Sequence, residues 1–320
     1  MLSLQFTIPS LFYLCLMNIN IRFSLSLLLV AFLLGCDTNT AQRPAYLSVD
    51  ELKLASDPTA SFGNSSSKIT SAWVSVSGTN LGAFELPMNI PVMIDSNDTY
   101  DIRIEPGIDI NGISSFRGIY PFYKPLDIQL ALKQGDVTNF PQGSKKIVEY
   151  DFNSNLGELV VLNLEDFEDV GRNLIPTDQS DTSWILTSNP DLKFTAPPGE
   201  GNIYSGMAIL DTGISKFEVS SIENFILPRG GKDVYIEFDY WTTNPVTFGV
   251  IAANPGQIIQ MPTATFSSNE KWNHGYINLL TEVSGSPLAS SFKIFMGSAK
   301  LNNGKLDTVL VDNIRLIYRQ

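Results

Sequence analysis

Apolar and polar residues alternate along most of this 320-residue chain, and no long stretch repeats apolar residues at the spacing of one helix face. The pattern is clearest in the segment 234–241. Its alternate apolar residues, which would share one side of an extended strand, are Val234, Ile236, Phe238 and Tyr240. Aromatic residues make up 11% of the chain, and 23 Gly and 18 Pro supply turn positions. We therefore predict an all-β protein with low helix content.

The N-terminal segment carries a pattern for export and lipidation. The 12-residue apolar stretch 23–34 runs into Leu33–Cys36, which reads Leu-Leu-Gly-Cys and resembles the lipobox of bacterial lipoproteins. The resemblance implies that residues 1–35 are a signal peptide and that Cys36 receives a lipid. The only charge before the apolar stretch is Arg22, so a start at Met17 would give the short cationic segment that an export signal needs.

An uncleaved transmembrane anchor over residues 2–34 is the alternative, because about 20 apolar residues span a bilayer. Polar residues and a proline interrupt that stretch, namely Pro9, Asn18, Asn20 and Arg22. We favour the lipoprotein, whose several acyl chains, as the resemblance implies, would anchor it stably to a membrane.

The chain beyond the signal has neither a disulfide nor a basic surface charge. Of the two cysteines, Cys15 lies in the predicted signal and Cys36 would be acylated. From Cys36 onward, 20 Lys and Arg stand against 33 Asp and Glu, which gives a net charge of about -13. That charge repels nucleic acid, so we expect no nucleic-acid partner. The remaining 285 residues are enough for about two domains.

Residues 36–44 are predicted to be a lipidated tether, and residues 45–160 an immunoglobulin-like β-sandwich. Short strand-forming segments at regular spacing suit a sandwich. These segments are 69–77, 81–86, 92–94, 100–104, 126–132 and 148–152. Trp73 lies within a strand rich in β-branched residues, and we expect it in the core.

A long apolar connection, 107–123, interrupts that spacing. Connections above about 12 to 15 residues in a compact domain are usually functional or disordered, and this one is too apolar for disorder. Two interpretations stay open. The connection is either a strand pair folded onto the core or a contact surface for a protein partner.

Residues 161–320 are predicted to be a second, larger all-β unit. The order of its motifs resembles the jelly-roll modules found among carbohydrate-binding and galactose-binding-like domains. The motifs are Phe167-Glu168-Asp169 near the start, Trp184 soon after, Trp272 opening a late strand, and a closing strand Val311-Asp312-Asn313-Ile314-Arg315-Leu316. The resemblance implies a β-jelly-roll sandwich. Because each motif is short, it supports the fold far better than any ligand.

Together, the lipobox, the sandwich and the terminal jelly roll resemble envelope lipoproteins of the Bacteroidota type. Many proteins of that group handle glycans outside the cell. The resemblance therefore implies a cell-envelope protein that is lipid-anchored to a bacterial membrane, with the outer membrane favoured.

No stretch of the sequence points to a reaction. His274 is the only histidine, and no Gly-x-Ser-x-Gly elbow supplies a nucleophile, so neither a Ser-His-Asp triad nor a multi-histidine zinc site is available. A lone histidine before a strand is expected to be a surface or turn residue. Two carboxylates can hydrolyse glycosides, but none of the 33 acidic residues is singled out for that role. We predict a non-catalytic protein.

The jelly-roll resemblance implies one metal site. Related jelly rolls often hold a structural calcium ion with carboxylates from the first and last strands, and Glu168 and Asp312 occupy matching places. Calcium takes about six to eight oxygens, so backbone carbonyls and Asp169 would have to contribute as well. The alternative is that both carboxylates are ordinary strand-end residues facing water.

Sugar binding needs exposed aromatic faces beside polar groups. The candidate residues are Trp184, Tyr240, Trp241 and Trp272. Alternation puts Trp241 on the opposite face from Tyr240, so at most one of the two lines the core. Trp241 is the best candidate for an exposed platform, against the alternative that it packs in the core or between domains.

Two hypotheses about function follow. In the first, the jelly roll of a membrane-anchored, non-catalytic lipoprotein binds an extracellular glycan. In the second, the protein is a structural or assembly component of the envelope and docks a protein partner, with the apolar connection 107–123 as the contact surface. Exposure of the tryptophans discriminates between the two hypotheses.

Overall fold

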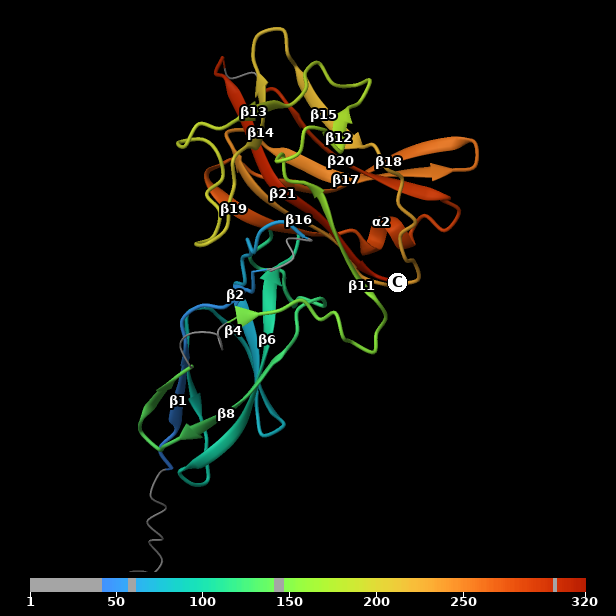
Figure 1. Cartoon of the computed structure of the whole chain (residues 1–320). Helices are drawn as coiled ribbons and strands as arrows, with labels where there is room; N and C mark the ends of the chain where they lie inside the picture. Colours follow the sequence, from blue (N-terminus) through green and yellow to red (C-terminus); the bar gives the residue numbers. More distant parts are fainter. Residues whose placement is uncertain (1–41, 57–61, 141–146, 302–303) are drawn as a thin grey trace, which may run out of the picture. The chain divides into compact units, whose positions relative to one another are not determined.

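The computed structural model describes residues 42–56, 62–140, 147–301 and 304–320, and within them it is almost entirely β-strand. One short helix, α2 (Leu280–Ser284), is present in these residues (Figure 1). The prediction of an all-β protein with low helix content is confirmed. The predicted signal peptide and Cys36 lie outside the described residues. Among the residues that are described, no helix has the length and apolar character to cross a membrane.

Residues Ala45–Gln320 form one compact unit with two hydrophobic cores. We call residues 45–153 the N-terminal part and residues 159–320 the C-terminal part. The core of the N-terminal part also includes Tyr235, Tyr276 and Ile317 of the C-terminal part. Because these residues join the two cores, the division into two domains at residue 160 stays a prediction.

The N-terminal part has two main sheets and one short strand pair. The β6 sheet consists of β4 (Thr79–Glu85), β3 (Ser71–Val76), β6 (Asp98–Asp109) and β7 (Arg117–Ile119), with β8 (Leu126–Leu132) also paired to β6. The other main sheet has the order β5 (Met88–Val92), β1 (Ala45–Val49) and β9 (Val137–Asn139). The short pair is β2 (Lys53–Leu54) with β10 (Ile147–Val148).

Strand alternation decides the position of Trp73. Ala72 and Val74 on either side of it are buried, so the indole lies on the opposite face and is only partly buried. A Cβ atom on Gly107 would come within 2.2 Å of that ring, so the indole covers the glycine. The prediction that Trp73 lies in the core is wrong, because β-branched neighbours do not change which side of a strand a residue occupies.

The connection 107–123 contains the strand pair of the first interpretation, since β7 pairs with the end of β6. Its last residues, Tyr120, Phe122 and Tyr123, are buried. The Tyr120 ring lies 5.1 Å from the Tyr235 ring and 5.2 Å from the Tyr276 ring. This end of the connection therefore packs on the C-terminal part of the same chain.

Two antiparallel sheets form the C-terminal sandwich. The β21 sheet has the order β13 (Ile185–Thr187), β14 (Ser205–Leu210), β21 (Asp307–Arg319), β16 (Val234–Thr242) and β19 (Asn269–Asn278), with β11 (Leu159–Glu165) also paired to β21. The β20 sheet has the order β12 (Leu174–Pro176), β15 (Lys216–Ser221), β20 (Ser291–Ala299), β17 (Val246–Asn254) and β18 (Gln257–Phe266).

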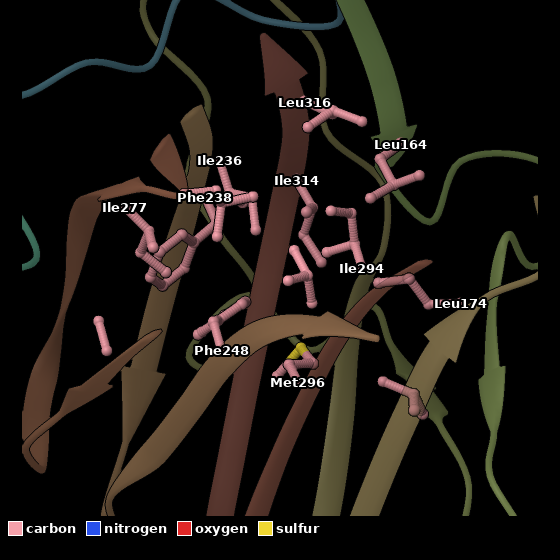
Figure 2. Close-up of a cluster of buried hydrophobic side chains, with 14 of the residues drawn as sticks. Leu164, Leu174, Ile236, Phe238, Phe248, Ile277, Ile294, Met296, Ile314 and Leu316 are labelled. Carbon is pink, nitrogen blue, oxygen red and sulfur yellow. The ribbon is translucent and has the colours of Figure 1, made fainter. Parts of the chain in front are cut away.

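The core between these sheets contains the side chains that alternation predicts. Ile236 and Phe238 of β16 face Phe248 and Met296 of the opposite sheet (Figure 2). Val234 and Tyr240 belong to the same core. The residues between them on β16 must then point to the outer face of the β21 sheet. Most of these are buried as well, since the burial pattern of β16 is nearly continuous.

Candidate functional site

A row of polar side chains crosses the outer face of the β21 sheet. Strand register and one hydrogen bond place its members side by side: Thr187, Ser205, Asp312, Asp239 and His274. All five are less than a tenth exposed. Asp239 and Asp312 are direct neighbours across two strands, an arrangement that is unfavourable if both carry a charge.

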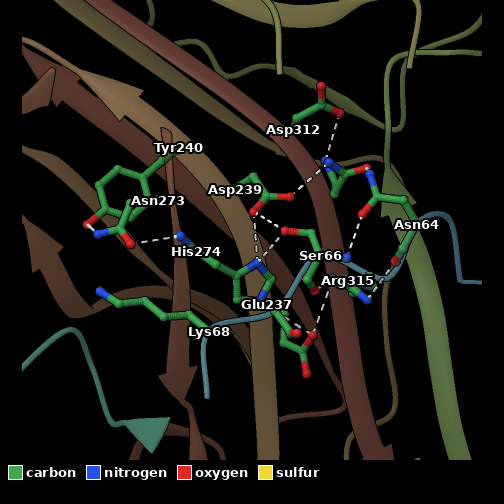
Figure 3. Close-up of polar contacts among 12 residues, drawn as sticks. Asn64, Ser66, Lys68, Glu237, Asp239, Tyr240, Asn273, His274, Asp312 and Arg315 are labelled. Carbon is green, nitrogen blue, oxygen red and sulfur yellow. Dashed lines mark hydrogen bonds and ion pairs between the residues drawn. The ribbon is translucent and has the colours of Figure 1, made fainter. Parts of the chain in front are cut away.

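Beside this row lies an ion pair with no exposure to solvent. Glu237 and Arg315 are cross-strand partners, both are 0% exposed, and a guanidinium nitrogen lies 3.5 Å from the Glu237 carboxylate (Figure 3). We call Glu237, Asp239, His274 and Arg315 the charge cluster. Taking such charges out of water is costly unless their partners satisfy them.

Residues of the N-terminal part supply many of those partners. The Arg315 guanidinium donates to the backbone carbonyls of Asn64 and Ser66, and the Ser66 hydroxyl donates to Asp239 at 2.5 Å. Asn64 donates to the side chain of Asn313, which in turn donates to Asp239. The segment 62–68 therefore covers the cluster (Figure 3).

Two buried tyrosines complete the surroundings of Glu237. Tyr120 donates to one carboxylate oxygen at 2.5 Å and Tyr150 to the other at 2.8 Å. Burial raises the pKa of a carboxyl, but Arg315, His274 and the hydroxyl of Tyr120 outweigh it and hold the pKa of Glu237 below its ordinary value. Glu237 is therefore an anion at neutral pH, bound by donors from both parts of the chain.

His274 lies between two carboxylates. Its Nδ1 is 2.8 Å from Asp239, and its Nε2 is 3.7 Å from Glu237. Burial lowers the pKa of a histidine, but Asp239 and Glu237 outweigh it, and the pKa of His274 is raised. The prediction that His274 is a surface or turn residue is wrong, because its ring is covered by a segment far away in the sequence.

Ser66, His274 and Asp239 include the residue types of a catalytic triad but not its geometry. Ser66 lies 3.3 Å from Nδ1, the same ring nitrogen that faces Asp239. In a triad the serine meets Nε2 while the aspartate holds Nδ1. All three side chains are also buried. This group therefore joins the two parts of the chain and cannot act as a triad.

Asp312 is buried among hydrogen-bond donors. Its carboxyl accepts from Ser205 at 2.5 Å, from Asn202 at 3.1 Å and from the backbone of Asn313. Burial, together with the nearby carboxylate of Asp239, outweighs those hydrogen bonds and raises the pKa of Asp312 to about 8. At neutral pH this group is mostly a neutral acid.

These surroundings do not fit calcium at Glu168 and Asp312. A calcium ion needs several oxygen ligands, but Asp312 meets N–H and O–H donors, and one Glu168 oxygen accepts from the backbones of Ile203 and Tyr204. In the described part of the chain, no group of three His, Cys, Asp or Glu side chains is placed to hold a metal. The alternative prediction, that both carboxylates are strand-end residues facing water, is also wrong for Asp312, because Asp312 is 0% exposed. Both carboxylates instead bind the segment 202–205.

Three of the four predicted sugar-binding residues pack their rings against other aromatic rings. Tyr240 is 6% exposed and packs against Phe238 and Phe266, so it is a core residue. Trp184 packs against Phe167 and Phe217. Trp272 packs edge-on against Phe194 and donates to the carbonyl of Leu192 at 3.0 Å. Tyr240 therefore has no face free for stacking, whereas Trp184 and Trp272 are partly exposed but already pack against aromatic neighbours.

Trp241 is partly exposed like Trp184 and Trp272, but its ring forms no aromatic pair within the described residues. It belongs to an apolar row across four strands, which we call the Trp241 row: Ile185, Met207, Leu310 and Trp241. Neighbouring strands are about 4.8 Å apart, so the row is about 14 Å long. A register shift in β19 places residues 270–272 opposite Trp241, and Glu270 and Lys271 are exposed there.

Comparisons with known proteins return structures but no sequence relatives. No protein-family model and no curated protein matches the chain. The enzymatically active domain of bacteriophage CBA120 tailspike protein 4 matches at a TM-score of 0.37 and 12% identity, over 57% of this chain and 25% of that one. The present chain thus spans about a quarter of that domain.

Carbohydrate-binding modules also occur among the similar structures. The family 11 module of a Clostridium thermocellum cellulosomal cellulase gives a TM-score of 0.34 and 13% identity, over 50% of this chain and 95% of the module. The xylan-binding CBM22-2 domain of Paenibacillus barcinonensis Xyn10C gives 0.33 and 12%, over 49% and 98%.

Proposed function

We propose that the protein is a lipid-anchored, non-catalytic lipoprotein of the bacterial envelope that binds a neutral glycan on the Trp241 row. The observation that carries the proposal is Trp241, a partly exposed indole that forms no aromatic pair within the described residues. The anchor rests on the lipobox resemblance of Leu33–Cys36.

The Trp241 row has the chemistry that a sugar chain needs. Trp241 and Met207 offer apolar surface for the C–H faces of pyranose rings, and Glu270 and Lys271 offer hydrogen-bonding groups for hydroxyls. A length of about 14 Å along the row suits a short run of sugar units better than a single one. The net charge of -12 disfavours a polyanionic glycan, so a neutral chain is the better ligand.

The direct test measures retention of the full chain on a panel of neutral polysaccharides by affinity electrophoresis. We expect wild type to be retarded by at least one of them, and Trp241→Ala to lose about tenfold or more of the affinity. Trp73→Ala is the matched control, since Trp73 is also a partly buried tryptophan on an outer strand face. Absence of retardation by the whole panel, or equal retardation of Trp241→Ala, would refute the proposal.

The anchor and the absence of catalysis have separate tests. Cys36→Ala should abolish labelling by a radioactive fatty acid in the producing bacterium, and undiminished labelling would reject the lipobox. Incubation with a polysaccharide that binds should release no reducing ends. Turnover of that polysaccharide would show that the protein is an enzyme.

A second candidate function is supported by exposed apolar side chains on the connection 107–123. Ile113, Phe116 and Ile119 are 50%, 54% and 40% exposed. Contiguous exposed apolar surface is typical of protein contacts. This candidate predicts that Phe116→Glu removes the protein from a larger envelope complex on native gels, whereas Trp241→Ala does not.

A further inference from the structure

A cavity of about 240 Å³ opens in the N-terminal part, and no residue of the Trp241 row lines it. Its base is made by Leu54, Phe62 and Tyr150, each only about 5% exposed, and Phe152 at its edge is 49% exposed. All lining residues fall within residues 54–153. The cavity is smaller than the range of about 300 to 1,000 Å³ that is typical of drug-sized ligands, so it suits one small ring.

Three aromatic rings form one side of the cavity. Tyr150 lies between the other two, 5.0 Å from Phe62 and 6.1 Å from Phe152, and both contacts are edge-to-face. The Tyr150 hydroxyl donates to Glu237, and this hydrogen bond fixes the orientation of the tyrosine ring. A fixed aromatic wall of this kind binds an apolar ligand face with little loss of side-chain entropy.

Polar side chains of both signs surround the aromatic wall. Lys124, Glu149 and Asp151 line the cavity. The backbone of Lys124 donates to the carbonyl of Glu149, and that of Asp151 donates to the carbonyl of Phe122, each at 2.8 Å. These bonds hold donors and acceptors at defined places around the opening. A ligand with several hydroxyl groups matches such a set better than a purely apolar one.

The charges argue against an ionic ligand. Two carboxylates, Glu149 and Asp151, disfavour an anion. Lys124 disfavours a cation, Arg319 lies 3.4 Å from the Asp151 carboxylate, and Arg315 lies over the ring of Phe62 at 5.9 Å. Asp151 and the ring of Phe62 are therefore already engaged by the protein's own arginines. The ligand class that fits these groups best is a neutral molecule with one apolar face and several hydroxyls.

We propose that this cavity is a second carbohydrate site, which takes a single neutral pyranose unit with its C–H face on the aromatic wall. Nothing in the Trp241 proposal requires it, and the two sites share no lining residue. The cavity would hold the end or a side branch of a glycan, while the Trp241 row would bind an extended segment.

The test uses the full chain and ligand-detected saturation-transfer NMR. The probes are methyl β-glucopyranoside, methyl β-galactopyranoside, methyl α-mannopyranoside and N-acetylglucosamine, each at about 20 mM. We expect at least one to show transfer, with a dissociation constant in the millimolar range. Glucosamine and glucuronate, which have the same ring with a positive or a negative charge, should bind more weakly than the neutral sugars.

Variants separate this site from the Trp241 row. Phe152→Ala should weaken binding about tenfold, and Glu149→Gln should alter which pyranose binds best. Phe116→Ala is the matched control, since Phe116 is similarly exposed at 54% and does not line the cavity. Trp241→Ala should leave pyranose binding unchanged even if it abolishes polysaccharide retention. No transfer from any neutral probe, equal binding by Phe152→Ala, or tighter binding of a charged analogue would overturn the proposal.

Discussion

The two ends of the outer face of the β21 sheet differ in which side chains they bury. At one end Glu237 and Arg315 are 0% exposed, whereas at the other Trp241 is partly exposed and Ile185 is 46% exposed. Charges are normally outside and tryptophans mostly inside. The difference follows from what lies over each end, because the N-terminal part covers the charges, whereas Trp241 and Ile185 stay partly exposed and only Leu310 of the Trp241 row is buried.

The covered end shows how buried charges are tolerated. Glu237 receives two tyrosine hydroxyls and lies near Arg315, and Arg315 in turn donates to two backbone carbonyls. A buried ion pair with such partners need not stabilise a fold more than apolar residues would, but losing one partner is strongly destabilising. The charge cluster thus stabilises only one position of the N-terminal part on the β21 sheet.

The largest expected effect comes from removing Arg315, the buried guanidinium beside Glu237. Arg315→Met should lower the free energy of unfolding by about 3 to 5 kcal/mol, because it leaves the Glu237 carboxylate uncompensated in the interior. Urea unfolding followed by fluorescence measures the change. Arg103→Met is the control, since Arg103 pairs with Asp127 at an exposed site and should cost about 1 kcal/mol or less. Similar losses in both variants would contradict the role assigned to the cluster.

A smaller effect is expected from one hydroxyl at the same end. Tyr120→Phe should cost about 1.5 to 3 kcal/mol, because it removes a buried hydrogen bond to a charged carboxylate and keeps the ring packing. Tyr100→Phe removes an exposed hydroxyl contact to the backbone of Ser96 and should cost well under 1 kcal/mol. An unchanged free energy of unfolding in Tyr120→Phe would mean that Glu237 does not depend on the Tyr120 hydroxyl.

The covered end should also lose stability as the pH rises. A pKa of about 8 for Asp312 means that the folded state binds one more proton than the unfolded state between about pH 4 and 8. The contribution of Asp312 to the free energy of unfolding therefore falls with increasing pH, by up to about 1.4 kcal/mol per pH unit. His274 acts in the same direction, because its pKa is raised on folding and its contribution is lost as the pH passes that value.

Asp312→Asn tests this sign, since asparagine keeps the shape and cannot ionise. Unfolding free energies at pH 5, 6, 7 and 8 should decline less steeply in the variant than in wild type. Asp211→Asn serves as a control at an exposed turn. An unchanged slope in Asp312→Asn would show that Asp312 is already ionised in the folded protein.

The sequence predicted the strands better than it predicted which segments cover their outer faces. Alternation correctly placed Ile236 and Phe238 in the core and turned Trp241 to the other face, because these depend only on neighbours along the chain. Whether an outer face is covered depends on distant segments. Asn64 and Asn313, which hydrogen-bond at the charge cluster, are 249 positions apart.

The residues that sequence reasoning missed share one signal. Glu237 and Asp239 lie within a strand whose other residues are almost all apolar or aromatic, and Arg315 interrupts the short apolar run 314–318 near the end of the sequence. Opposite charges within two apolar runs indicate that both faces of a sheet are buried. That signal predicts an ion pair, but it does not say which segment covers it. The prediction for His274 was wrong for the same reason, because the sequence does not show which segment covers its ring.

The smallest effect on stability is expected at the open end. Trp241→Ala should change the free energy of unfolding by about 1 kcal/mol or less, because its ring is partly exposed and forms no aromatic pair within the described residues. Trp184→Ala is the contrasting variant, since its ring packs between Phe167 and Phe217 and its loss should cost about 3 kcal/mol. If Trp241→Ala proved as destabilising as Trp184→Ala, the indole would be a packing residue. The Trp241 row would then lose its claim to be a binding surface. A stable Trp241→Ala that no longer binds polysaccharide would instead separate the two ends of the sheet, one maintained for folding and the other for recognition.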